Sequence, residues 1–125
     1  MAVTHSTAAR NAAADAVVDL LDAGTPPGDL VFLTSGDVTV CTVQLANPAF
    51  GAAAAGVATL GGVPLTSNGA TAGTIAKAEF RNDAGTAVIF CAVSTSGSDI
   101  NIPGGLTLAT NDTVTVTSLT YTAPV

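Results

Sequence analysis

The chain has 125 residues, 48% of them hydrophobic and only 10% charged, and its formal net charge is −6. This length predicts one domain, residues 1–125, whose core needs neither a disulfide nor a metal ion. Its three basic residues are too few to neutralise a run of phosphates, which excludes nucleic acid and anionic membranes as expected partners.

The low charge content also limits which residues can form the surface. About 25% of the residues of a typical soluble domain are charged. We therefore expect a surface of small and hydroxyl-bearing residues, or one that is partly hidden against other subunits.

Residues 1–5 are expected to form a flexible arm. This segment lacks the basic flank and the apolar stretch of a secretory signal, so none is predicted. The chain also has no apolar run near the roughly 20 residues that a membrane-spanning helix needs.

The segment 6–23 is predicted to be an amphipathic helix. Ser6 or Thr7 can cap it, alanines favour it, and Gly24 followed by Pro26-Pro27 ends it. At about 100° per residue, one side is apolar and is expected to pack on the domain; it comprises Ala9, Ala13, Ala16, Val17, Leu20 and Leu21. The opposite side is expected to face water; it comprises Asn11, Asp15, Asp19 and Asp22.

Arg10 lies at the margin of the apolar side of this helix. Two interpretations stay open. Its long side chain can extend over the core edge to solvent, or it can pair with a carboxylate within the fold or across an interface.

Residues 29–122 predict a mainly β domain. About eight short, strand-like runs are separated by turn residues, a pattern typical of a β-sandwich or jelly roll. Leu30–Leu33 is a continuous apolar run, whereas the alternation in Val38–Leu45 changes phase, which indicates a bulge or a strand that crosses between sheets. The last part, from Leu106 to Thr122, predicts a closing hairpin with a turn at Asn111-Asp112.

A hairpin is predicted at residues 76–93. Asn82 to Gly85 supplies the turn residues, and the first strand alternates between charged and apolar positions. The second strand, Val88–Val93, is apolar on both sides, so we expect it to be covered on both faces, with the sheet edge near Phe80.

Cys41 and Cys91 both lie in strand-like runs. Buried free thiols are the favoured interpretation, and a disulfide that clamps two sheets is the alternative.

The sequence offers little for catalysis. His5 is the single histidine, no G-x-S-x-G nucleophile motif is present, and the glycine-rich segments lack the Gly-Lys-Ser/Thr ending of a phosphate-binding loop. One histidine and two separated cysteines do not make a zinc site. The sequence therefore predicts no enzyme, no cofactor and no metal.

Three parts of the chain resemble a group of small virion proteins of tailed bacteriophages. They are the helix Ala9–Gly24, the loop Asn47–Gly51, and the region that runs from Ala78–Arg81 through Gly97–Ile102 to Thr113–Thr120. The resemblance covers residues 6–122. It implies a capsid decoration or cement protein: a β-rich virion component, often a homotrimer, that binds the major capsid protein on the outer surface after assembly in the host cytoplasm.

Two other functions stay open. The first is a structural protein of the tail or of the head–tail joint. The second is a carbohydrate-binding β-sandwich module, for which the absence of Trp and the single tyrosine leave little aromatic platform. For the decoration function, five residues are candidate interface positions: Val3, His5, Arg10, Phe50 and Tyr121.

Overall fold

A computed structural model describes residues 3–22 and 27–123 of the chain. Helix α1 (Thr7–Asp19) continues into a 3-10 turn, η1 (Leu20–Asp22). Ser6 is the N-cap, and its hydroxyl oxygen accepts a hydrogen bond from the Ala9 N–H at 3.2 Å. The predicted helix is confirmed from its cap to residue 22. Gly24 and Pro26, where the helix is expected to end, lie outside the described residues.

The strands are short and follow one another to the C-terminal part of the chain. They are β1 (Asp29–Leu33), β2 (Thr39–Gln44), β3 (Val57–Thr59), β4 (Leu65–Thr66), β5 (Gly73–Thr74), β6 (Lys77–Arg81), β7 (Ala87–Ser94), β8 (Ile100–Asn101), β9 (Thr107–Leu108), β10 (Thr115–Val116) and β11 (Thr120–Thr122). The predicted class, a mainly β, sandwich-like domain with one N-terminal helix, is confirmed. The prediction that residues 1–125 form one domain stays a prediction.

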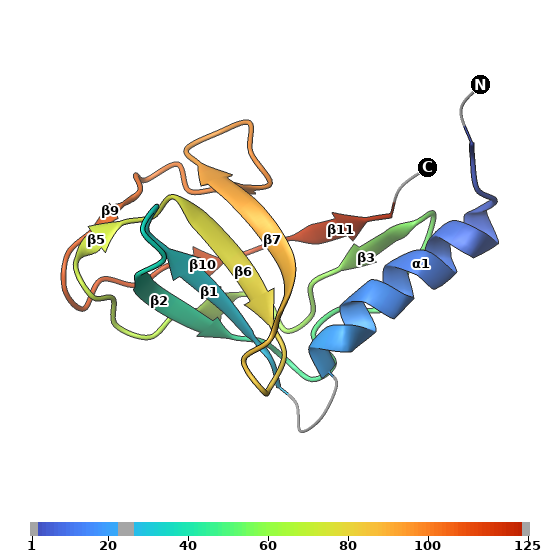
Figure 1. Cartoon of the computed structure of the whole chain (residues 1–125), viewed down its shortest axis with the longest axis horizontal. Helices are drawn as coiled ribbons and strands as arrows, with labels where there is room; N and C mark the ends of the chain where they lie inside the picture. The colour runs from blue at the N-terminus through green and yellow to red at the C-terminus, as the bar shows by residue number, and fades with distance from the viewer. Residues whose placement is uncertain (1–2, 23–26, 124–125) are drawn as a thin grey trace.

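The main sheet has five strands in the order β2-β1-β6-β7-β8, and three two-stranded sheets pair β10 with β4, β11 with β3, and β5 with β9. Figure 1 shows α1 beside β3 and β11, away from the five-stranded sheet. Strands β9, β10 and β11 each pair with an earlier strand, so the predicted closing hairpin over residues 106–122 is wrong.

The predicted hairpin at residues 76–93 is confirmed as β6 and β7, with a turn in which the Gly85 N–H donates to the Asn82 carbonyl at 3.0 Å. The predicted alternation of β6 is also confirmed, because Ala78 and Phe80 are buried and the charged residues that alternate with them are half-buried. The predicted position of the edge is wrong. Strand β6 lies between β1 and β7, and β7 is the outer strand of the hairpin.

The phase change in the second predicted strand is confirmed as a bulge. Phe32 pairs with Cys41 and Leu33 with Thr39, so Val40 is the extra residue of β2. The hydrophobic core lies on the inner face of the main sheet. Its largest side chains include Leu30, Phe32 and Phe80.

Both cysteines are free. Cys41 and Cys91 belong to the same sheet, because Cys41 pairs with Phe32, Phe32 with Ala78, and Ala78 with Cys91. Three strand spacings separate the two thiols, roughly 14 Å, so the alternative of a disulfide between two sheets is wrong.

The predicted orientation of the helix is wrong for most of its residues, although Leu21 is buried and Asp19 is exposed as predicted. The polar side of α1 and η1 faces the body of the protein, where Asn11, Asp15 and Asp22 accept hydrogen bonds from backbone N–H groups of the 49–56 loop. The distances are 2.7 Å from Gly56 N to Asn11 Oδ1, 2.7 Å from Ala53 N to Asp15 Oδ1, and 3.1 Å from Ala49 N to Asp22 Oδ1.

This inversion leaves apolar side chains of the helix in solvent. They are Ala8, Ala9, Ala12, Ala13, Ala16 and Leu20. Only Ala14, Val18 and Leu21 are buried. The amphipathic pattern failed as a guide because loop N–H groups without a strand partner need acceptors, and the polar side of the helix provides them. No helix in the described parts of the chain is long and apolar enough to cross a membrane.

Candidate interaction surface

The outer edge of β7 is the least covered part of the main sheet. Strand β7 pairs with β6 over most of its length, but on its other side it pairs with β8 only at Val93 and Ser94. Within residues 3–22 and 27–123, no strand pairs with the outer side of residues 87–92. Figure 1 shows this strand in orange beside β6.

Phe90, in the middle of this uncovered stretch, is 71% exposed. It pairs with Glu79 across the hairpin, and side chains alternate along a strand, so Phe90 lies on the outer face of the sheet while Ile89 and Cys91 lie on the inner face. The expectation that Val88–Val93 is covered on both faces is therefore wrong, because only Val93 in that run is buried.

One hydrogen bond fixes the direction of the backbone groups of this edge. The Ala92 N–H donates to Asp99 Oδ2 at 2.9 Å, so it points away from β6. In an antiparallel pair, the N–H and C=O groups of every second residue point to the same side. The N–H and C=O of Phe90 therefore also point outward, while those of Ile89 and Cys91 point toward β6.

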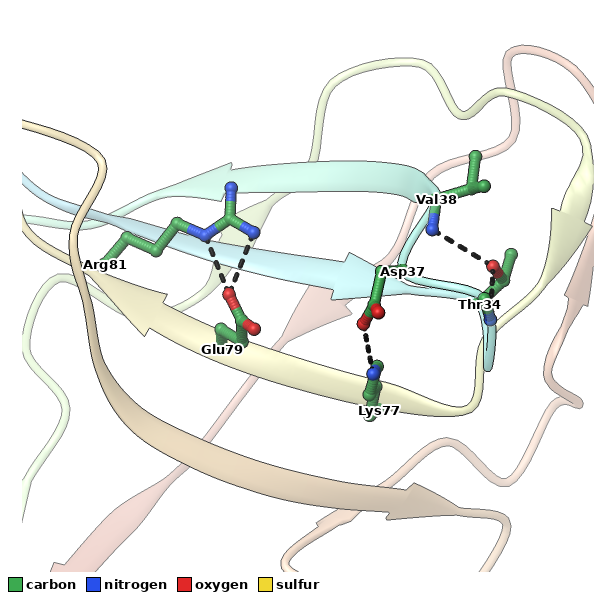
Figure 2. Close-up of polar contacts among 7 residues, drawn as sticks. Thr34, Asp37, Val38, Lys77, Glu79 and Arg81 are labelled. Atoms are coloured by element: carbon green, nitrogen blue, oxygen red, sulfur yellow. Dashed lines mark hydrogen bonds and ion pairs between the residues drawn. The ribbon is translucent and has the colours of Figure 1, made fainter.

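The charges beside this edge are paired (Figure 2). Arg81 of β6 binds Glu79 Oε2 through Nε at 2.9 Å and through Nη2 at 2.8 Å, and Lys77 forms an ion pair with Asp37 from the turn between β1 and β2. Asp37 lies in a turn in which Thr34 Oγ1 accepts the Val38 N–H at 3.2 Å. Two of the three basic residues of the chain thus lie next to β7.

A groove of about 340 Å³ runs along the inner side of β7, between this strand and β11. Its lining includes Phe50, Phe80, Ile89, Cys91 and Tyr121. Burial and, to a smaller extent, the nearby Asp99 carboxylate raise the pKa of the Cys91 thiol to about 11. The thiol is therefore protonated at neutral pH and is a poor nucleophile.

A second groove, of about 660 Å³, lies between the 99–105 loop and the 113–120 segment, with Leu30 and Phe32 in its lining. Its lining combines apolar side chains with four threonines, and Asp99 is the one charged residue among those that line it.

At the end of the sheet, burial raises the pKa of the Asp29 carboxyl. The Asp83 carboxylate raises this pKa further, and the Arg81 guanidinium lowers it.

The five predicted interface residues do not form one patch. Val3 is 79% exposed and His5 is exposed, both ahead of the helix. Phe50 is 5% exposed and packs on Phe80 with a ring-centroid distance of 5.7 Å, so it belongs to the core. Tyr121 is half-buried on β11, where it lines the groove beside β7. The interface roles of these residues stay predictions.

Arg10 makes a contact that neither sequence interpretation anticipates. Its guanidinium lies against Gly56, where an added Cβ would stand 2.7 Å from Arg10 Cζ, so a larger residue at position 56 would require the guanidinium to move. Gly56 also has φ of 76°, which independently favours glycine. Arg10 Nε is buried and has no hydrogen-bond partner, so no ion pair forms through this atom, while the residue as a whole is half-buried.

Sequence reasoning missed Phe90. A run of apolar residues without polar alternation indicates burial on both faces, and this run is instead an outer strand. The lack of polar alternation is the same signal that an edge awaiting a partner would give. In the described ranges, no group of three or more His, Cys, Asp or Glu residues is placed to hold a metal ion.

Comparisons of this chain with protein-family models, with curated proteins and with solved structures find no match.

Proposed function

We propose that this chain is a virion structural protein of a tailed bacteriophage that binds the outer surface of the capsid and stabilises it, as a decoration or cement protein. It acts without catalysis, as a homo-oligomer, on the major capsid protein. The sequence resemblance to small phage virion proteins supports this role.

The observation that carries the proposal is the inverted helix. Its polar side is used inside the molecule, and its alanine-rich side, ending in Leu20 at 53% exposure, faces outward. Val3, which precedes the helix, adds a second large apolar side chain. The hydrogen bonds to the 49–56 loop account for the inward polar side, and the apolar outer side is the surface that the capsid would cover under this proposal.

The energetics of a cement protein fit such a surface. Burial of apolar area contributes about 25 cal/mol per Å², and a decoration protein repeats a modest contact over many symmetric sites. The small side chains of alanine let a helix approach a partner closely without ordering long side chains, which keeps the entropic cost of binding low. The net charge of −6 suits a position on the outside of the shell, away from packaged DNA.

The experiment adds the purified protein to capsids that lack it and measures bound copies and the temperature at which the shells open. We expect saturable binding and a higher opening temperature. Replacing Ala13 and Leu20 by Glu is expected to abolish both effects, because it places charge on the outer side of the helix. The control introduces the same charges at the exposed positions Ser96 and Thr110.

Absence of binding by the unaltered protein would contradict the proposal. Electron cryo-microscopy of whole particles separates it from the tail or joint alternative, since a decoration protein covers the shell and a joint protein occupies one vertex.

A further inference from the structure

The open stretch of β7 has the properties of a pairing surface. It comprises residues 87–91, and none of these residues is charged. It is bounded by the 82–85 turn at one end, and at the other by β8 and by the Asp99 carboxylate on the Ala92 N–H. Soluble proteins usually protect such an edge with lysine, proline or a covering segment. Here the exposed Phe90 occupies its middle instead.

The backbone of Phe90 is self-complementary. Its N–H and C=O both point outward, so they form a donor and an acceptor on one residue. In an antiparallel pair, two residues directly opposite each other can exchange both hydrogen bonds. A second Phe90, related by a two-fold axis, satisfies both groups at once.

Charge favours a second copy as the partner. A chain with net charge −6 repels itself over most of its surface. On the outer face beside Phe90, however, Lys77 is paired with Asp37 and Arg81 with Glu79, and the nearest uncompensated charge on this edge is Asp99, which lies at its end on the Ala92 N–H. The centre of the edge, at Phe90, therefore adds little to the repulsion between two copies.

We propose that β7 of one copy pairs antiparallel with β7 of a second copy about a two-fold axis at Phe90. The pairing links the two main sheets at Phe90 and places both Phe90 side chains in contact with each other on the outer face. Each copy thus supplies to the other the same uncharged strand. A two-fold contact of this kind is closed, because the same surface is used on both copies.

This inference goes beyond the proposed function and does not depend on capsid binding, because it concerns a contact between two copies in solution. It also differs from the homotrimer that the resemblance implies. A two-fold contact gives a dimer or an assembly with an even number of copies.

Cross-linking at position 90 tests the geometry. Residues that exchange both hydrogen bonds have Cα atoms about 5.5 Å apart, which a disulfide can span. In a Cys91→Ser background, we expect Phe90→Cys to form a covalent dimer under mild oxidation. The control is Val38→Cys in the same background, since Val38 is also exposed, at 60%, but lies in the turn before β2. Equal cross-linking of the two variants, or none at position 90, overturns the proposal.

The mass in solution gives a second, non-covalent test. We expect the unaltered chain to sediment as a dimer or an even multiple, and Phe90→Lys to raise the dissociation constant by roughly tenfold or more. Val38→Lys, with the same change of charge, is expected to leave the mass unchanged. A monomer or a trimer for the unaltered chain overturns the two-fold contact, and capsid binding by such a chain would leave the proposed function standing.

Discussion

At the β2 side of the main sheet, a loop supplies hydrogen-bond partners to the outer backbone groups, whereas at the β7 side such partners lie only beside Ala92, Val93 and Ser94, and no strand or loop of the described residues bonds the outward groups of Phe90. Asn68 Oδ1 accepts the Thr42 N–H at 2.9 Å, the Asn68 N–H returns to the Thr42 carbonyl at 3.0 Å, and the Thr71 N–H donates to the Val40 carbonyl at 2.8 Å. Along β7, Asp99 bonds one N–H and β8 covers the last two residues.

The two sides of the sheet differ in what their outer backbone groups contribute. A side whose backbone groups are satisfied within the chain contributes to folding. A side whose outward groups are free of such bonds is where the proposed partner strand would bind. Substitutions on the two sides should therefore affect different measurements.

The largest expected effect contrasts two phenylalanines of one hairpin. Phe80→Ala should lower the free energy of unfolding by about 3–5 kcal/mol, because Phe80 is buried in the core beneath the sheet. Phe90→Ala should change it by no more than about 0.5 kcal/mol in a monomeric sample, because Phe90 is exposed. Urea unfolding at low protein concentration measures both. A loss at Phe90 equal to that at Phe80 would mean that the β7 edge is covered.

Ser67 gives an intermediate effect on the covered side. Its buried hydroxyl accepts the Val114 N–H at 2.8 Å and donates to the Asn68 carbonyl at 2.9 Å. We expect Ser67→Ala to lower the free energy of unfolding by about 1–3 kcal/mol, because a buried N–H is left unpaired.

The matched control is the neighbouring Thr66→Ala, which removes only an exposed contact of 3.4 Å between Thr66 and Thr115. Its cost should be well under that of Ser67→Ala. Equal costs would contradict the role given to Ser67 in closing this side.

The smallest effect concerns the two thiols. Cys41, in the covered part of the sheet, should not react with iodoacetamide in the folded protein. Cys91 borders the groove, but its pKa of about 11 keeps the thiolate scarce at pH 8, roughly two orders of magnitude below that of an ordinary thiol. Its alkylation rate should therefore rise about tenfold per pH unit until the pH approaches 11.

The Asp99→Asn variant sharpens this test. Removing the carboxylate removes one of the two causes that raise the pKa, so alkylation of Cys91 at a given pH should become faster. A slower reaction, or a rate that does not depend on pH, would contradict the stated origin of the shift.

Local features of the fold could be read from the sequence. The Ser6 cap, the hairpin turn at residues 82–85 and the alternation of β6 each depend on residues close together in the chain. The order of the strands could not be read from the sequence, because the apolar run of β7 suits a central strand and an outer strand that binds a partner equally well.

The orientation of the helix could not be predicted for a related reason. Asp15 bonds a backbone N–H 38 residues away, and Asn11 bonds one 45 residues away. Hydrophobic periodicity describes which side of a helix is apolar, but it does not describe which distant loop has N–H groups that lack partners. The candidate surfaces of this protein lie where these long-range contacts override the local pattern.

Amide hydrogen exchange along β7 tests the account most directly. In the Phe90→Lys chain, which we expect to be monomeric, the amides of Ile89 and Cys91 should exchange slowly because they face β6, while the amide at position 90 should exchange rapidly. In the concentrated unaltered protein, the Phe90 amide should become as protected as its neighbours. A Phe90 amide that is slow in the dilute monomer would show that the edge is already covered, and would contradict the account.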